Sequence, residues 1–240
     1  LHWSEEDIGA PKSAAPFESY HLSEVAEQCR ADFKRWCSLK NWYLKRGIPW
    51  RRGHLLYGPP GTGKTALVRA LAQEADMPVF CYDLSTLNNG EFCYSWESMQ
   101  ESAPCIALIE GIDGVFHGRD NVLAHQDELR SSLTFDCLLN ALGGIQTADG
   151  VFVVITTNKP ETLDDALGKP TADGKSSRPG RIDRVFELLP PAADIRSEII
   201  KRICDEVTIP DLEETAEMTA AQVTEWAICK ALSKTWEDAA

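Results

Sequence analysis

The sequence predicts an α/β protein in which a five-stranded parallel sheet lies between two layers of helices, followed by a small helical unit. Short apolar runs alternate with helical stretches, as in chains that build parallel sheets. The runs are almost continuously apolar, which is typical of strands buried on both faces. After Pro190-Pro191 the pattern becomes entirely helical.

The predicted elements follow in order along the chain. A helix is expected over residues 22–37, where apolar side chains recur every three or four positions, and a shorter helix over 39–45. The predicted strands are residues 54–57, 79–82, 106–109, 151–155 and 185–188. Helices over 65–75 and 135–142 lie between strands.

Two capping patterns open the helices of the C-terminal part. Asp194 is expected to cap a helix with four isoleucines on one side, and Thr219 with Gln222 fits a capping box that opens a last helix toward Leu232.

The chain therefore divides into three predicted parts. Residues 1–16 form an extended arm, residues 17–190 the sheet domain, and residues 191–240 the helical unit. About 50 helical residues are few for an independent core, so we expect them to pack on the sheet domain.

Charge and composition exclude several classes of partner. The net charge of −13 argues against duplex nucleic acid, which binds surplus Lys and Arg. No apolar run approaches the roughly 20 residues needed to cross a bilayer, so no membrane span is expected in this chain. Eight cysteines without a C-x-x-C pair indicate a reducing compartment and no zinc site. We expect a cytoplasmic location, or the mitochondrial matrix side if a segment before Leu1 targets or anchors the chain.

A glycine-rich sequence joins the first predicted strand to the next helix. Gly58 to Thr65 fits G-x-x-x-x-G-K-[ST] without a gap. In this setting backbone N–H groups at a helix N-terminus surround phosphates, Lys64 reaches the β- and γ-phosphates of ATP, and Thr65 offers its hydroxyl to Mg²⁺. A chance glycine turn is the alternative, which the flanking strand and helix disfavour. The predicted nucleotide-binding residues are Gly58, Pro59, Pro60, Gly61, Thr62, Gly63, Lys64, Thr65 and Ala66.

Two strand ends carry further candidates. Glu110 ends the third predicted strand, where a carboxylate can hold Mg²⁺ together with Thr65; a solvated strand end is the alternative. Asn158 ends the next strand, where an amide can orient the attacking water, although such an Asn alone is usually a turn former.

Arg178 and Arg181 lie three residues apart around a Pro-Gly turn. A surface turn with a salt bridge is the plain interpretation. The alternative is a pair of arginine fingers that supply positive charge to the phosphates of an adjacent subunit.

Together these motifs resemble the AAA family of ATPases. Within it they resemble the mitochondrial ATPases that export the folded Rieske iron–sulfur protein for assembly of the cytochrome bc complex, with their bacterial and fungal relatives. Four stretches carry the likeness: 42–57 leading into the glycine loop, 109–113, 133–142, and 156–158 with 178–183. The first is specific to this subgroup, the others are common to AAA proteins, and the likeness covers about residues 17–190.

The resemblance implies a three-layer P-loop ATPase fold with a helical lid from about Pro191. It also implies a ring of six or seven identical subunits with Mg²⁺-ATP between them, and a protein client. Residues 17–21 would lie near the adenine, and Ala220 and Ala221 near the nucleotide.

Three departures from the family pattern stand out. Gly111 replaces the second carboxylate of the pair that ends the metal-binding strand, so the position of the catalytic acid has no side chain. Asp113 is the only nearby acid, and we expect a structural role for it. Gly143 replaces a second family acid, and a polar insertion at residues 168–177 precedes the arginine pair.

Threading members of the family place an aromatic pore loop between the second and third strands, here residues 85–100. Phe92, Tyr94 and Trp96 are present there, but without the usual aromatic-apolar-Gly arrangement, and core positions are the alternative.

Three functions stay open from the sequence. The first is an ATP-driven chaperone or translocase, with hydrolysis slowed at Gly111. The second is a nucleotide-gated assembly module with little turnover. The third, a P-loop kinase or nucleic-acid-directed NTPase, is disfavoured by the arginine pair and the acidic composition.

Overall fold

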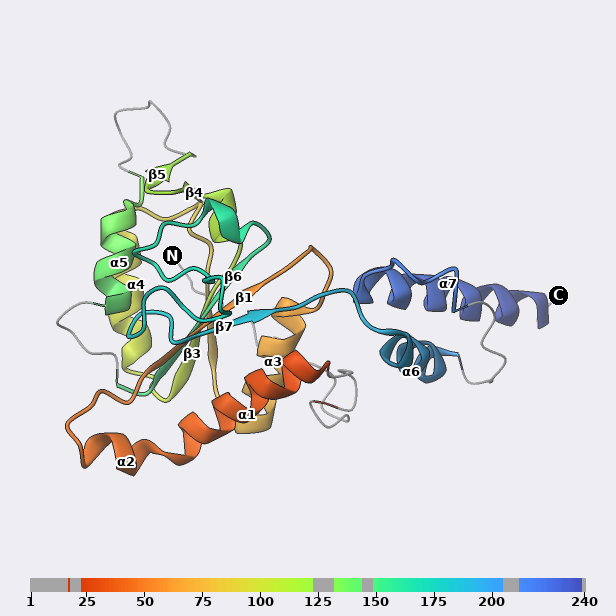
Figure 1. The fold of residues 1–240 in the computed structure, drawn as a ribbon, viewed down its shortest axis with the longest axis horizontal. Coiled ribbons are helices and arrows are strands. Elements are labelled where there is room, and N and C mark those ends of the chain that lie inside the picture. The colour runs from red at the N-terminus through yellow and green to blue at the C-terminus, as the bar shows by residue number, and fades with distance from the viewer. Residues whose placement is uncertain (1–16, 18–22, 123–131, 144–148, 205–211, 239–240) are drawn as a thin grey trace.

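The computed structural model describes residues 17, 23–122, 132–143, 149–204 and 212–238 (Figure 1). The strands are β1 (Arg52–Tyr57), β2 (Val79–Tyr82), β3 (Cys105–Ile109), β4 (Phe116–His117), β5 (Asp120–Asn121), β6 (Val151–Thr157) and β7 (Arg184–Glu187). The α-helices are α1 (Glu24–Ser38), α2 (Lys40–Leu44), α3 (Lys64–Ala75), α4 (Asn89–Gln100), α5 (Phe135–Gly143), α6 (Ala193–Ile203) and α7 (Ala220–Asp238). Two short 3-10 helices are η1 (Ile112–Gly114) and η2 (Pro160–Thr162).

The main sheet has five strands, all parallel, in the order β2-β3-β6-β1-β7. This confirms the predicted fold class and all five predicted strands. Every residue of β3 and β6 is buried, as their apolar sequences require. The order places the carboxyl ends of β1, β3 and β6 side by side, which is where parallel sheets position their sites.

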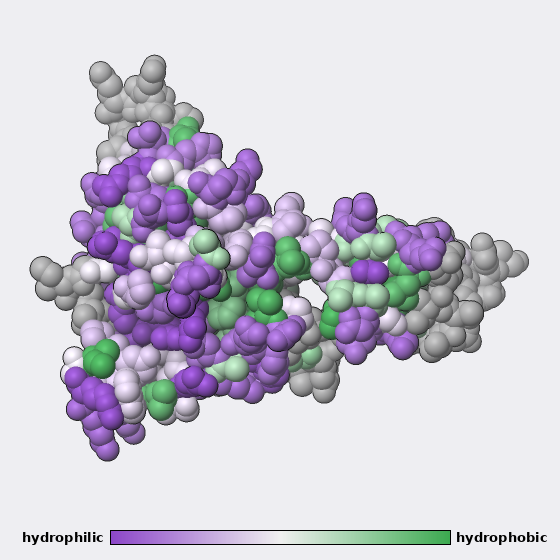
Figure 2. All heavy atoms as spheres, in the orientation of Figure 1, coloured by the Kyte–Doolittle hydropathy of each residue, from purple (hydrophilic) through white to green (hydrophobic). Residues whose placement is uncertain are grey.

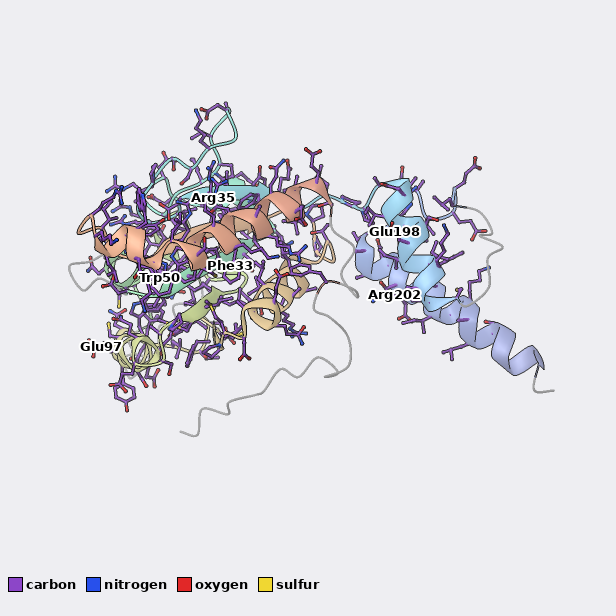
Figure 3. The ribbon with its side chains drawn as sticks, turned by 90° about the horizontal axis from the view of Figure 1, so that it is seen from below. Phe33, Arg35, Trp50, Glu97, Glu198 and Arg202 are labelled. Atoms are coloured by element: carbon purple, nitrogen blue, oxygen red, sulfur yellow. The ribbon has the colours of Figure 1, made fainter. Side chains whose placement is uncertain are left out.

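Two hydrophobic clusters fill the layers on either side of the sheet. Helices α1 and α3 contribute to one cluster, in which the ring of Phe33 meets Phe152 of β6 edge to face at 4.8 Å. Trp36 of α1 stacks on Trp50 at 4.7 Å, and Figure 3 shows α1 lying along the sheet domain with Phe33 and Trp50 beneath it. Helices α4 and α5 contribute to the other cluster. Helices therefore cover both faces of the sheet, which gives the molecule three layers.

Helix α4 occupies the segment in which a pore loop was considered. Asn88 caps it, and its side chain and that of Glu91 form a capping box. Phe92 and Trp96 are buried in the core, whereas Tyr94 is 71% exposed. Two of the three aromatic residues are therefore core residues of a helix rather than residues of an exposed loop.

Helices α6 and α7, here called the lid helices, pack mainly on each other. Ile199 and Ile200 of α6 and Val223 and Ala227 of α7 form a separate cluster. The expected packing on the sheet domain is limited: the unit meets that domain at the glycine loop, where the Ala221 N–H donates to the Gly61 carbonyl at 3.0 Å, and Figures 1 and 3 show both helices extending away from it. The physical reason is that the buried apolar side chains of the two helices contact mainly one another.

The starts of the lid helices differ in how well the sequence predicted them. Asp194 does not cap α6: Ala192 holds the N-cap position in extended conformation after the two prolines, and Asp194 lies in the first turn. Thr219 and Gln222 do form the predicted capping box. Helix α7 continues beyond the predicted end, to Asp238. Within the described residues, none of the helices is both long and apolar enough to span a bilayer.

Candidate active site

A cleft of about 750 Å³ opens at the carboxyl edge of the sheet, between the sheet domain and the lid helices. Figure 2 shows the surface narrowing at the connection between these two parts, with an opening beside it. The lining residues from the sheet domain include Pro60, Gly61, Thr62, Gly63, Lys64, Thr65, Ala66, Glu110, Gly111, Thr156, Thr157 and Asn158. Those from the lid helices include Ile195, Ile199, Arg202, Ala220, Ala221, Thr224 and Glu225.

The glycine loop turns sharply from β1 into α3. Gly58 has a φ of +136°, and a Cβ atom there would lie 2.1 Å from the carbonyl oxygen of Leu188, so only glycine fits. At the far side of the loop, the backbone N–H of Ala221 donates to the carbonyl of Gly61 at 3.0 Å. The start of α7 therefore contacts the loop directly, and Ala220 and Ala221 line the cleft as expected.

Lys64, the first residue of α3, folds its ammonium group back onto the loop. Its Nζ donates to the carbonyl oxygens of Gly58 at 2.8 Å and Pro59 at 2.9 Å. Burial lowers the pKa of Lys64 from its ordinary value, and the charge of Asp113 opposes that shift. The group is thus partly desolvated beside the loop, where phosphate oxygens could replace the two carbonyls.

Thr65 and Glu110 bring hydroxyl and carboxylate oxygens together from two elements. The Thr65 hydroxyl, at the start of α3, donates to the Glu110 carboxylate at the end of β3. Within the described part of the chain, no group of three or more His, Cys, Asp or Glu side chains could hold a metal ion. The pair fits Mg²⁺, which usually keeps several waters and takes one or two protein oxygens plus those of phosphates.

Gly111 leaves open space next to Glu110. Its φ is +58°, and a Cβ atom added there would meet nothing within 4 Å. Its backbone N–H donates to the Thr156 hydroxyl at 3.2 Å. Hence position 111, where the resemblance leads us to expect a catalytic acid, has room for a side chain but presents none.

Asp113 is held in a structural network. One carboxylate oxygen accepts from the Thr157 hydroxyl at 2.7 Å and from the backbone N–H of Asn158 at 3.1 Å. This agrees with the structural role expected for Asp113, because the bonds fix the end of β6. The exposed Asn158 consequently has a defined backbone position at the rim of the cleft.

The arginine pair lies at the opposite edge of the sheet. Arg178 and Arg181 precede β7, which runs parallel to β1, so they sit near the amino end of β1. The glycine loop follows the carboxyl end of that strand, about 20 Å away at the usual rise per residue. The structure therefore does not bring the two arginines to the cleft of their own chain.

Arg181 occupies the space that Gly143 leaves. A Cβ atom at Gly143 would lie 2.6 Å from the Arg181 Nε, and Arg181 Nη1 donates to the carbonyl of Ala166 at 2.7 Å. Burial lowers the pKa of Arg181, and the charges of Arg178 and Arg119 lower it further. The Arg119 guanidinium is paired with Asp164 at 3.3 Å.

The insertion at residues 168–177 folds into a closed turn. Backbone and side-chain bonds join Lys169 to Ser177, and Pro170 pairs with Ser176. Its two ends thus lie next to each other, so the extra residues extend outward from a short neck before Arg178.

The N-terminal residues predicted near the adenine are mostly outside the described residues. Phe17 is described: its ring lies 4.2 Å from the Arg30 guanidinium and packs against the α1–α3 cluster. Residues 18–21 lie outside the described residues. Sequence reasoning missed Arg202, Thr224 and Glu225, which line the cleft from the lid helices, because nothing in a surface helix pattern marks such residues.

The motif order, the sheet order and the position of the glycine loop agree with one family. The family described as ATPase family associated with various cellular activities (AAA) matches residues 54–174, half of the chain. This chain belongs to the AAA family.

Its similarity extends to curated chaperones of this family. The chain is 36% identical to a probable mitochondrial chaperone bcs1 of Schizosaccharomyces pombe, over 75% of this chain and 38% of the relative. It is 38% identical to the mitochondrial chaperone BCS1 of Danio rerio, over 73% of this chain and 41% of the relative. It is also 34% identical to the ATP-dependent zinc metalloprotease FtsH of Clostridium perfringens, over 75% of this chain and 25% of the relative. The chain thus spans less than half the length of these relatives.

Proposed function

We propose that this AAA chain binds Mg²⁺-ATP in the cleft, at an interface with a neighbouring copy in a ring of six or seven subunits, and acts on a protein client as a chaperone or translocase. The observation that carries the proposal is the convergence of the glycine loop, Lys64 and the Thr65–Glu110 pair at one edge of the sheet. The similarity to mitochondrial chaperones supports a protein client and a mitochondrial location. The cytoplasm is the other location that the sequence leaves open.

Each group of residues in the cleft would bind a different part of Mg²⁺-ATP. Backbone N–H groups of the loop from Gly58 to Ala66 would surround the phosphates, and Lys64 would neutralise them. Thr65 and Glu110 would hold Mg²⁺, which supplies charge neutralisation at the phosphates. Asn158 would orient water at the rim of the cleft. Lid residues from α6 and the start of α7 would close over the base and sugar.

The arginine pair would complete the site of the neighbouring copy. Because Arg178 and Arg181 lie at the amino edge of the sheet, they can reach a nucleotide only across a subunit boundary. This placement supports an arrangement in which ATP lies between subunits.

Hydrolysis is the step that Gly111 should slow. Cleavage of ATP needs a group that accepts a proton from water, and such assistance is typically worth about 10²–10⁴-fold. Asp113 is engaged by Thr157 and Asn158, and Glu110 would serve the metal. We therefore expect ATP binding to survive and turnover to be slow.

The decisive experiment restores the acid at position 111. Gly111→Asp should raise the steady-state ATPase rate by about 10²-fold, with ATP affinity little changed. Asp suits the left-handed backbone better than Glu, whereas Gly111→Ala introduces similar strain without a carboxylate and is the matched control. Gly111→Glu should raise the rate less. Brisk turnover by the natural chain, insensitive to Asp113→Asn, would show that the base lies elsewhere.

A second candidate function rests on Gly111 and Gly143, the two positions at which the resemblance leads us to expect an acid. With no acid at Gly111 or Gly143, the ring would bind ATP and hold one conformation, acting as a nucleotide-gated assembly module. The turnover of the natural chain separates the candidates, because a motor requires repeated hydrolysis and a gate does not.

A further inference from the structure

Two thiols on neighbouring helices face each other in the layer formed by α4 and α5. The Sγ atom of Cys93 in α4 lies 3.5 Å from the Sγ atom of Cys137 in α5. Cys93 is exposed and Cys137 is partly buried. We propose that these two residues form a reversible disulfide by exchange with a low-molecular-weight disulfide such as glutathione disulfide, and so constitute a modification site distinct from the nucleotide cleft.

The helices hold the two thiols in place through a polar contact at their N-termini. The side-chain oxygen of Asn89 accepts from the backbone N–H of Thr134 at 2.7 Å and from the Thr134 hydroxyl at 3.2 Å. The Cys137 thiol also donates to the carbonyl of Asn89 at 3.8 Å. Figure 1 shows α4 and α5 side by side on one face of the sheet. Because a disulfide has an S–S distance of about 2.05 Å, the sulfurs need approach by only about 1.5 Å, within reach of side-chain rotation.

The exchange takes place in two balanced steps. The Cys93 thiolate attacks one sulfur of glutathione disulfide, the S–S bond of that molecule breaks, and one glutathione leaves as a thiolate. The Cys137 thiolate then attacks the Cys93 sulfur of the mixed disulfide and releases the second glutathione. The protein loses two electrons and two protons, and one glutathione disulfide becomes two glutathione thiols.

The environments of the two thiols set the order of attack. Burial and the neighbouring Cys93 raise the pKa of Cys137 to about 12, which keeps it protonated. Cys93 is more exposed and so meets the soluble disulfide first. Once Cys93 is part of a mixed disulfide, burial still holds the pKa of Cys137 above its ordinary value, and the second attack is favoured because it is intramolecular.

The crosslink would tie α4 to the helix that ends beside the arginine pair. Helix α5 ends at Gly143, and Gly143 contacts the Arg181 side chain. A covalent bond near the start of α5 would restrict its movement relative to α4. The disulfide would therefore stiffen the layer of the sheet domain that supports the amino-edge arginines.

The test uses the full chain, reduced and then incubated with glutathione disulfide under native conditions. Intact mass measurement and peptide mapping after alkylation should show a Cys93–Cys137 disulfide as the main product. Cys137→Ser should instead accumulate one glutathione on Cys93, because the resolving thiol is absent. Cys93→Ser should not form a crosslink involving Cys137. Cys229→Ser removes an exposed cysteine of α7 and should leave the Cys93–Cys137 product unchanged.

A second test compares the folded chain with the denatured chain and needs no variant. The natural chain treated in strong denaturant should give a mixture of pairings among its eight cysteines, whereas the folded chain should give one. The oxidised folded chain should also have a higher unfolding midpoint than the reduced chain. The proposal is overturned if the folded natural chain accumulates glutathione on Cys93 as the Cys137→Ser variant does, or if the mapped disulfide joins other cysteines.

Discussion

Lys64 holds its ammonium group against the carbonyl oxygens of Gly58 and Pro59, in contact with the loop that is proposed to hold phosphates. This position is partly buried, and burial lowers its pKa. A phosphate oxygen would offer the cation a full negative charge in place of two carbonyl dipoles. The two carbonyls thus hold the ammonium group beside the loop, where it could exchange them for phosphate oxygens.

Removal of this cation should therefore weaken ATP binding strongly. Hydrogen bonds to charged groups contribute about 1.5–3 kcal/mol each, so Lys64→Ala should raise the Kd for ATP by about 100-fold or more. Arg69→Ala is the matched control, because it removes one exposed positive charge from the same helix. Titration with a fluorescent ATP analogue measures both, and unchanged affinity in Lys64→Ala would refute the P-loop assignment.

Thr65 should affect the metal more than the nucleotide. Its hydroxyl is paired with Glu110, and both oxygens are proposed ligands of Mg²⁺. Thr65→Ala should raise the Mg²⁺ concentration needed for half-maximal ATP binding, with a smaller effect on binding without metal. Thr65→Ser keeps the hydroxyl and should behave like the natural chain. An equal Mg²⁺ requirement in all three proteins would place the metal elsewhere.

At the scale of elements, a buried polar network joins α1 to β1. The His54 imidazole lies 3.4 Å from the Cys29 sulfur and 2.8 Å from an Asp32 oxygen, and Asp32 also accepts two bonds from Arg52 at 2.8 Å. The order of Cys, His and Asp resembles a catalytic arrangement, but the thiol is 1% exposed and burial raises its pKa. The network is therefore structural: it anchors the helix to the first strand of the sheet.

Burial fixes the charge states in this network. Burial lowers the pKa of His54, so the imidazole is neutral, donating to Asp32 and accepting from Cys29. For Asp32, burial alone would raise the pKa, but hydrogen bonds from His54 and Arg52 outweigh it and hold the pKa well below its usual range. Because the pKa values of His54 and Asp32 are both lower in the folded chain, the unfolded chain binds more protons than the folded chain in acid.

Stability should consequently fall as the pH drops through the unfolded histidine range. An unfolded histidine titrates near pH 6.5, so the free energy of unfolding should decrease below about that value, with His54 contributing at most about 1.4 kcal/mol per pH unit. The Asp32 contribution should be lost only below about pH 4. Urea unfolding at pH 5 to 8 measures the first effect. His54→Gln should flatten the curve in this window, whereas His117→Gln, an exposed histidine, should leave its slope unchanged.

The whole molecule has its two functional groups at opposite edges of the sheet. The cleft lies at the carboxyl edge, and Arg178 and Arg181 lie at the amino edge. In the proposed arrangement, one chain would offer a nucleotide to one neighbour and arginines to another, which is a heterologous contact that can close into a ring. The lid helices, which pack mainly on each other, border the cleft without filling it.

This separation predicts nucleotide-dependent assembly. Light scattering should report a larger particle with ATP and Mg²⁺ than without them, and Arg181→Ala should weaken the larger species. Lys175→Ala, which removes an exposed cation from the nearby inserted turn, should not. The same particle mass with and without nucleotide would contradict the proposed interface for this chain.

The sequence by itself determined the five strands, the parallel sense of the sheet and the glycine loop, because each leaves a pattern in consecutive residues. A continuous apolar run predicts a strand that is buried on both faces. The conformation of the loop from Gly58 to Thr65 is set by the glycines within that loop. The capping box of Thr219 and Gln222 was equally readable, since its bonds span three residues. The domain boundaries and the roles of Glu110, Asn158 and the two arginines stay predictions.

Only the tertiary structure decided what depends on distant neighbours. Arg202 and Glu225 border the cleft because the lid helices meet the glycine loop. Arg181 lies next to Gly143 because the strand that follows it, β7, pairs with β1 in the sheet. The same holds for Cys93 and Cys137, which are 44 residues apart in the chain and 3.5 Å apart between sulfurs. Such contacts depend on how the layers pack. Residues that are distant in the chain and meet only through packing show no repeating pattern in the sequence.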